Sequence, residues 1–211
     1  MIRSFLLSCS IIVIAIASCD AAVQPNALNR QKSLQDTCDN PDADPGCAFV
    51  SIPSQLNHIM LLSEKGEKGE RLVVKGQLKD ASGRPLSNIF MYAYQTDITG
   101  RYTKNGNEKG IQRFHGRLHG WGKTNSNGEY EIHTIKPAPY PGGRAAAHIH
   151  VILKPNKDAR AFYINDIVFS DDPNVNDDYR NNERSPGGSG IITLKNNNGV
   201  LEGRRDIVLT R

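Results

Sequence analysis

Three observations on the sequence predict an all-β protein, a β-sandwich of mostly antiparallel strands. Short apolar runs recur from Arg71 to the end of the chain. Turns rich in Gly, Pro and Asn separate these runs, and no segment keeps a helical period over ten residues. Regularly spaced short strands of this kind are typical of a sandwich. A single domain of this size buries enough apolar surface to be stable alone.

The expected strands follow one another along the second half of the chain. The first covers residues 71–78 and ends at a turn over 80–85 that contains Gly and Pro, and the second covers 88–96. The Asn-Ser-Asn-Gly segment at 125–128 predicts a hairpin between strands 120–124 and 129–134, because Asn-Gly readily adopts positive φ. Further strands are expected over 147–153, 162–169, 190–195 and 199–209, with the last two joined by a hairpin at 196–198.

The N-terminus has the pattern of an export signal. A basic start is followed by an apolar run over residues 5–17 and by small residues before Cys19. Ile-Ala-Ser-Cys looks like a bacterial lipobox, which would make Cys19 the lipidated first residue of the mature protein. The alternative is an ordinary signal peptide cut near Ala21 or Ala22. The apolar run is shorter than a membrane-spanning helix needs. We therefore expect an exported protein, lipid-anchored at the bacterial cell envelope and facing the periplasm or the outside.

These features predict three parts: a signal peptide over 1–18, a lipidated tether or adaptor over 19–58, and the sandwich over 59–211. Cys38 and Cys47 lie in a polar, proline-bearing stretch of the tether. An even number of remaining cysteines in an oxidising compartment predicts a disulfide that closes a short loop between them.

His148-Ile149-His150 carries the strongest chemical signal. Side chains at i and i+2 of a strand project from one face, so the two imidazoles form half of a metal site. Ile149 is expected to point the other way, into apolar packing.

Other motifs accompany this one in a fixed order. They are Tyr-Ala-Tyr-Gln-Thr-Asp at 92–97, Gly-Arg-Tyr ending at Tyr102, Thr-Ile-Lys-Pro-Ala-Pro-Tyr-Pro around Tyr140, and then the two histidines. This ordered set resembles the intradiol ring-cleavage dioxygenases, the catechol and protocatechuate dioxygenase family. The resemblance spans roughly residues 71–172.

The resemblance implies that Tyr102, Tyr140, His148 and His150 bind a non-haem Fe(III) ion. Ferric iron is hard and suits phenolate oxygen together with imidazole. The implied reaction cleaves a catechol-type aromatic with O2, between the two hydroxylated carbons, to a cis,cis-muconate-type diacid. A tyrosine released by the substrate would accept a catechol proton, and the sequence leaves open which of the two does so.

The chain departs from the family pattern at two places. The family arginine three residues before the first histidine is Ala145 here, so Arg144 is the nearby candidate for stabilising charge on the ring. One residue of register changes the face of a strand, although the glycines at 142–143 could restore it. The family glutamine after the second histidine is not evident, and Asp166 falls near its place.

Composition limits the other classes of function. The net charge is +4 without a basic cluster, which argues against nucleic-acid binding. Two alternatives to a dioxygenase stay open: an iron- or catechol-binding surface module with weak or no turnover, and a non-enzymatic sandwich for adhesion or carbohydrate binding. A homo-oligomer is also left open. A zinc pair at His115 and His119 is disfavoured, since glycines follow both. A place at the pocket mouth is the alternative, because both lie between the two tyrosines in the sequence.

Overall fold

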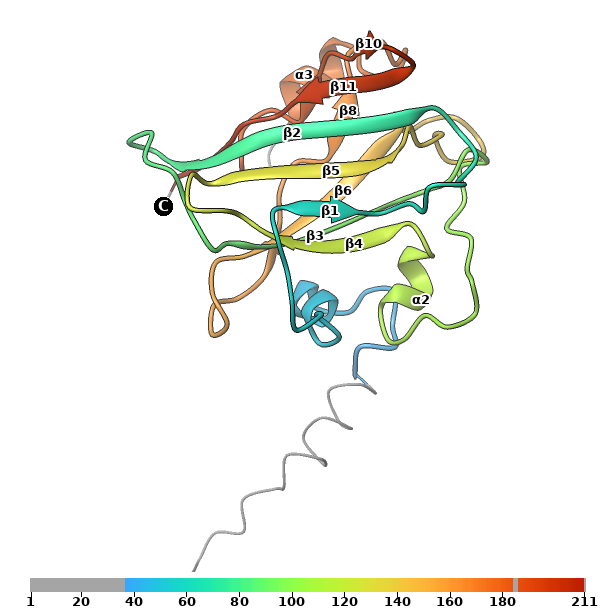
Figure 1. The fold of residues 1–211 in the computed structure, drawn as a ribbon. Coiled ribbons are helices and arrows are strands. Elements are labelled where there is room, and N and C mark those ends of the chain that lie inside the picture. The colour runs from blue at the N-terminus through green and yellow to red at the C-terminus, as the bar shows by residue number, and fades with distance from the viewer. Residues whose placement is uncertain (1–36, 184–185, 211) are drawn as a thin grey trace, which may run out of the picture.

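The computed structural model describes residues 37–183 and 186–210, and it forms two facing sheets (Figure 1). The first sheet has the order β1 (Ile59–Leu61), β5 (Glu129–Ile135), β2 (Arg71–Asp80), β11 (Val200–Arg204) and β10 (Lys195–Asn197), with β12 (Ile207–Leu209) also paired to β2. The second has the order β4 (His119–Lys123), β3 (Phe90–Gln95), β6 (His148–Lys154), β8 (Ile167–Phe169) and β9 (Ile191–Ile192), with β7 (Phe162–Tyr163) also paired to β6. The predicted β-sandwich is therefore confirmed.

The core lies between the two sheets and follows the alternation of the strands. Leu72, Val74 and Leu78 of β2 are fully buried, and they belong to the same apolar cluster as Ile149 and Val151 of β6. The opposite face of the second sheet carries a separate aromatic cluster that includes residues of β3 and β4. The central strands β3 and β6 thus carry apolar packing on both faces, and the outer face also holds the chemistry described below.

The hairpin predicted at residues 125–128 is wrong. The turn is present, with Gly128 N donating to Asn125 O at 3.0 Å. However, β4 pairs with β3 and β5 pairs with β2, so the turn carries the chain from one sheet to the other. Asn-Gly specifies a tight reversal of the backbone, and it does not specify that the flanking strands pair with each other.

Two long predicted strands are also divided in the structure. Residues 162–169 form β7 and β8 with a loop around Asp166 between them, and residues 190–195 contain β9 and only the start of β10. The hairpin between β10 and β11 is confirmed, and its turn residues Asn198 and Gly199 have φ of 52° and 86°. Positive φ at both positions is the geometry that such a two-residue turn needs.

Residues 37–58 pack against the outer face of the second sheet. They contain the Cys38–Cys47 disulfide and the 3-10 helix η1 (Pro45–Phe49). Phe49 is buried in the aromatic cluster, and Trp121 Nε1 donates to the Ala48 carbonyl at 2.7 Å. This part of the expected tether therefore covers a sheet face and lacks a core of its own.

Helices make only a small part of the described chain. The α-helices are α2 (Gln112–His115) and α3 (Asp177–Asn182). Asn176 caps the N-terminus of α3, and its side chain accepts from Tyr179 N at 3.0 Å. No helix within residues 37–183 and 186–210 is long and apolar enough to cross a membrane. Cys19 and the expected signal peptide lie outside the described residues.

An ion pair joins the loop before β2 to the segment between α2 and β4. Arg117 donates to both carboxylate oxygens of Glu67, with Nη2 2.9 Å from Oε1, and their side chains are 21% and 12% exposed. We expect Glu67→Gln to lower the free energy of unfolding at pH 7 by about 1–3 kcal/mol, the usual loss for a charged hydrogen bond. Urea unfolding of this variant measures the change, with the exposed Glu70→Gln as control.

The effect of Glu67→Gln has a predictable pH dependence. The hydrogen bond from Arg117 holds the pKa of Glu67 below its usual value. This stabilisation is therefore present above the unfolded-state pKa of about 4.3 and is lost as the pH falls through the lower folded-state pKa. The difference between wild type and variant should shrink in strong acid, and an equal difference at pH 7 and pH 2 would contradict the assignment.

Candidate metal centre

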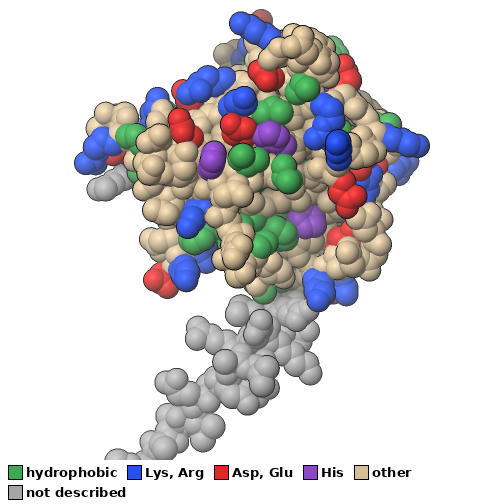
Figure 2. All heavy atoms as spheres, in the orientation of Figure 1, with side chains coloured by type: hydrophobic (Ala, Val, Ile, Leu, Met, Phe, Trp, Pro, Cys, Tyr) green, Lys and Arg blue, Asp and Glu red, His purple; other side chains and the backbone are tan. Residues whose placement is uncertain are grey.

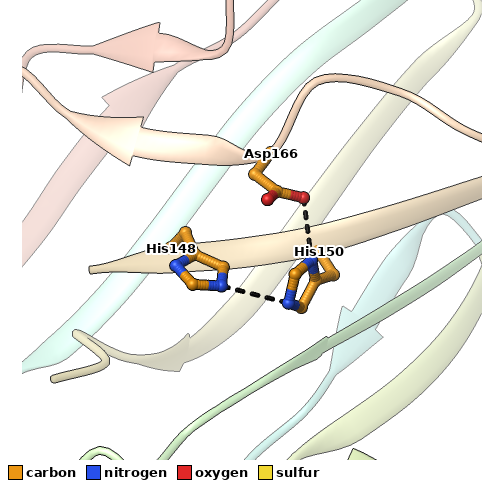
Figure 3. Close-up of side chains that lie close together, drawn as sticks. All are labelled: His148, His150 and Asp166. Carbon is orange, nitrogen blue, oxygen red and sulfur yellow. Dashed lines mark hydrogen bonds and ion pairs between the residues drawn. The ribbon is translucent and has the colours of Figure 1, made fainter. Parts of the chain in front are cut away.

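Strand β6 places His148 and His150 on the outer face of the second sheet. Ile149 and Val151 are fully buried between the sheets, whereas the two histidines are partly buried on the other side. Figure 3 shows both imidazoles projecting from the same strand, with Asp166 beside His150. The geometry agrees with the alternation expected for His-Ile-His.

The two tyrosines come from loops that follow β3 and β5. Tyr102 lies in a loop folded around the buried Asp97 carboxylate, which accepts from Thr99 N at 2.8 Å and from Thr103 Oγ1 at 2.9 Å. The backbone carbonyl of Asp97 also accepts from Ala138 N at 3.1 Å, two residues before Tyr140. A single aspartate therefore fixes the first tyrosine loop and ties it to the second.

Gly100 allows these two loops to approach each other. It has φ of +72°, and a Cβ at this position would lie 2.0 Å from the carbonyl oxygen of Pro139. Only glycine fits both the dihedral and the contact. The contact lies two residues before Tyr102 and one residue before Tyr140, so it sets the distance between the two phenols.

Four side-chain atoms from these elements converge on one point. Tyr102 Oη lies 2.5 Å from Tyr140 Oη and 3.0 Å from His150 Nε2. His148 Nε2 lies 3.1 Å from Tyr140 Oη and 3.0 Å from His150 Nε2, and Tyr140 Oη lies 3.2 Å from His150 Nε2. The structure therefore brings together the four ligands predicted from the sequence.

The Nδ1 atoms of both histidines make hydrogen bonds on the side of each ring that faces away from the converging Nε2 atoms. His148 Nδ1 donates to the carbonyl of Ala146 at 2.6 Å, and His150 Nδ1 donates to the Asp166 carboxylate at 2.9 Å. Neither acceptor can donate, so both Nδ1 atoms carry a proton. The two Nε2 atoms lie 3.0 Å apart, and when Nδ1 carries the single proton of each ring their lone pairs face one point, an arrangement that suits a cation between them.

The phenols complete a donor set that suits a hard trivalent ion. Burial raises the pKa of Tyr102 and of Tyr140, so both stay neutral near neutral pH without a metal. A bound cation reverses this preference, because it stabilises the phenolate much as it acidifies bound water. Two phenolate oxygens and two imidazoles fit Fe(III) by donor type.

Comparison with known proteins agrees with this geometry. A family model described as Dioxygenase matches residues 45–196, which is more than half of the chain. The chain belongs to the intradiol dioxygenase family. A curated relative in this family, the protocatechuate 3,4-dioxygenase beta chain of Burkholderia cepacia, is 34% identical over 92 residues. That alignment covers 40% of this chain and 39% of the relative, so the chain spans well under half of that relative's length.

Solved structures share the fold of this family member. The dioxygenase domain of a dioxygenase carbohydrate-binding protein fusion from Streptomyces sp. SirexAA-E matches with a TM-score of 0.55 and 21% identity, over 75% of this chain and 92% of that one. Catechol 1,2-dioxygenase from Acinetobacter sp. ADP1 matches with a TM-score of 0.57 and 21% identity, over 76% of this chain and 59% of that one. At this identity the similarity shows the shared fold.

Asp166 is the residue at the site whose role the sequence did not assign. It lies in the loop between β7 and β8, and with His148 and His150 it forms a cluster whose ligand atoms lie within 4.8 Å of one another. Its oxygen meets His150 on the Nδ1 side, away from the Tyr102 and Tyr140 oxygens at Nε2. Asp166 therefore orients the His150 ring, the position that carboxylates take beside metal-binding histidines.

Asp166→Asn is expected to weaken iron binding about tenfold to a hundredfold, the usual effect of losing such a partner. Competition with a chelator measures the affinity, and the visible band of the loaded protein gives an independent readout. Asp158→Asn, at an exposed aspartate, is the control. Equal iron affinity in the two variants would mean that Asp166 stabilises its loop and has no part in iron binding.

Arg144 is not brought into contact with the four ligands. Its side chain is exposed and makes no hydrogen bond or ion pair with another residue in the described part of the chain. Gly142 and Gly143 before it have φ of 107° and 71°, so the backbone does take the unusual path that glycine permits. A catalytic role for Arg144 stays a prediction.

His115 and His119 lie outside the group of four converging side chains and contact the residues packed around it. The His115 ring stacks on Tyr94 with centroids 3.6 Å apart, and Tyr94 stacks on His150 at 4.5 Å. His115 Nδ1 lies 3.1 Å from Tyr92 Oη, and burial lowers the pKa of His115 to about 3. His119 Nδ1 donates to the carbonyl of Gly116 at 2.7 Å. These contacts stack the Tyr94 and His115 rings behind His150.

Proposed function

We propose that this chain is a non-haem Fe(III) intradiol dioxygenase that cleaves a catechol-type aromatic with O2 to a cis,cis-muconate-type diacid. The observation that carries the proposal is the convergence of two phenol oxygens and two Nε2 atoms within 2.5–3.2 Å of one another. Catechol and O2 together contain every atom of the diacid, so the reaction needs no other reductant.

Bound Fe(III) would supply Lewis-acid polarisation of the catechol oxygens together with a redox-active centre for O2. Tyr102, Tyr140, His148 and His150 would hold it. The phenolate of Tyr102 or Tyr140 would accept a catechol proton at its oxygen. Family membership, the donor set and the hydrogen bonds from both Nδ1 atoms support these roles.

A cavity of about 480 Å³ is the candidate substrate pocket, and of the four predicted ligands His150 alone lines it. Tyr94 and Tyr163 line it, and their hydroxyls lie 3.3 Å apart. A pocket of this volume accommodates a substituted single ring, and aromatic walls stack favourably on such a ring. These residues would bind and orient the substrate while excluding bulk water.

The test is a visible spectrum with iron analysis of the purified protein, before and after catechol is added under air. We expect a reddish protein with stoichiometric iron, a band that shifts with catechol, and decay of that band as the diacid forms. A protein that cannot be loaded with iron would overturn the proposal.

The exposed Arg144 favours a second candidate function, an iron- and catechol-binding module without efficient turnover. A charge-stabilising arginine contributes only where it reaches the reacting ring. This candidate predicts iron and a catechol-induced band shift with no diacid. The same spectrum therefore distinguishes a dioxygenase from a binder.

We also propose that the protein is exported and anchored to a membrane by lipid on Cys19. The signal pattern before Cys19 and the disulfide between Cys38 and Cys47 support this, because disulfides persist in oxidising compartments. Wild type expressed in bacteria should enter the detergent phase on phase partitioning, and Cys19→Ser should stay in the aqueous phase. Equal partitioning of both proteins would overturn the anchor.

A further inference from the structure

The candidate substrate cavity has acidic walls. Besides His150, Tyr94 and Tyr163, its lining includes Asp166 and Glu183, and no lysine or arginine of the described residues lines it. Over the face drawn in Figure 2, by contrast, basic and acidic side chains are interspersed. The one-sided charge of the cavity is therefore a local feature.

Each of the two carboxylates has one oxygen engaged within the protein. Asp166 Oδ1 accepts from His150 Nδ1 at 2.9 Å, and Glu183 Oε1 accepts from Gly190 N at 2.6 Å. The second oxygen of each makes no hydrogen bond within the described chain. The Asp166 side chain is 30% exposed, and Glu183 is also partly exposed. Both negative charges are therefore presented at the cavity.

A buried arginine supplies a counter-charge to the two carboxylates. Arg205 is 2% exposed, donates from Nη1 to the carbonyl of Asn165, and interacts electrostatically with Asp166 and Glu183. Its Nε and Nη2 have no hydrogen-bond partner. One buried cation offsets part of two negative charges, and Arg205 is not among the residues that line the cavity. Among the described residues that line the cavity, the charged side chains that a ligand meets are therefore acidic.

We propose that this cavity selects catechols whose substituent is neutral or carries an ammonium group, and that it rejects catechols with a carboxylate substituent. The inference rests on the proposed function, which places the ring beside His150. A ligand carboxylate would lie near two like charges in a partly desolvated space, which is strongly unfavourable, whereas an ammonium group gains the corresponding attraction. The sequence relative from Burkholderia cepacia is named for protocatechuate, whose ring carries a carboxylate, so the two proteins would differ in this preference.

Three catechols of similar size test the selectivity: 3,4-dihydroxybenzylamine, 4-methylcatechol and 3,4-dihydroxybenzoate. The visible band of the ferric protein is titrated with each in the absence of O2, which gives Kd without turnover. We expect the benzoate to bind at least about tenfold more weakly than the benzylamine, with 4-methylcatechol between them. A benzoate that binds as tightly as the benzylamine overturns the inference.

Glu183→Gln assigns the preference to the cavity wall, because it removes one charge away from the metal ligands. The benzoate-to-benzylamine ratio of Kd should fall about threefold to fivefold, a size reduced by solvent screening. Glu202→Gln on β11 is the matched control and should leave the ratio unchanged. An unchanged ratio in Glu183→Gln overturns the inference.

If Glu183→Gln does not fold, the dependence of the wild-type Kd ratio on salt concentration tests the same repulsion. The wild-type ratio should fall as ionic strength rises from about 0.02 M to about 0.5 M, because screening weakens the repulsion. A benzoate-to-benzylamine ratio of Kd that does not change with salt concentration overturns the inference. A protein that shows no iron band with any of the three catechols overturns the proposed function itself, and the two failures are therefore distinguishable.

Discussion

His148→Ala is expected to remove iron from the protein and to abolish its visible absorption. The variant deletes one of four converging donors, whose Nε2 lies 3.0 Å from that of His150 and 3.1 Å from the oxygen of Tyr140. Loss of a hydrogen-bonding partner of a metal ligand already costs tenfold to a hundredfold in affinity, so loss of the ligand should cost more than about a hundredfold. Chelator competition and the visible spectrum measure this effect.

The fold should survive this change. His148 projects from the outer face of β6, and the core residues of that strand lie on the other face. The free energy of unfolding of the iron-free protein should therefore change by less than about 1 kcal/mol. His133→Ala is the matched control, since that histidine lies on β5 and bonds to Glu131 at 2.8 Å. Full iron content in His148→Ala would remove this residue from the ligand set.

Tyr140→Phe tests whether this phenol oxygen binds iron without disturbing the fold. It deletes a single oxygen that lies 2.5 Å from Tyr102 and within 3.2 Å of both histidines. We expect the charge-transfer band to shift or vanish while the circular dichroism spectrum is retained. An unchanged band in Tyr140→Phe would mean that this phenol is part of the packing only.

The parts of the site that local sequence could predict are those that depend on strand alternation and on ordered motifs. His148 and His150 share a face because side chains alternate along a strand, whatever the strand packs against. The two tyrosines could be assigned only through the resemblance to a family. Nothing in their own spacing brings them to within 2.5 Å of each other.

The parts that could not be predicted depend on tertiary contacts. Asp166 reaches His150 because the expected strand 162–169 breaks into β7 and β8. Asn165-Asp166 interrupts the apolar run at this place, but two polar residues do not by themselves determine that the strand ends or which side chain they meet. The turn at 125–128 crosses between the sheets, since a turn motif does not determine which strands pair. Asp97 organises both tyrosine loops through hydrogen bonds, one of which links residues about forty positions apart.

Gly100→Ala is the second change from which we expect a large effect, because it acts on two tyrosine loops at once. An alanine there would have to keep φ near +72°, which costs about 1–2 kcal/mol for an L-residue. Its Cβ would also lie 2.0 Å from the carbonyl oxygen of Pro139, a distance at which the backbone must move. We expect the free energy of unfolding to fall by more than about 3 kcal/mol, the sum of strain and displaced backbone.

Iron binding should respond as well, because the displaced segment carries Tyr140 directly after Pro139. A shift of about 1 Å in one catalytic group is enough to cost about a hundredfold in rate, and a ligand oxygen is no more tolerant. Gly83→Ala separates the two causes, since Gly83 has φ of +83° with no atom within 4 Å of an added Cβ. That control carries the dihedral strain alone and should keep full iron affinity. If Gly100→Ala matches Gly83→Ala in stability and in iron affinity, the Pro139 contact does not set the distance between the phenols.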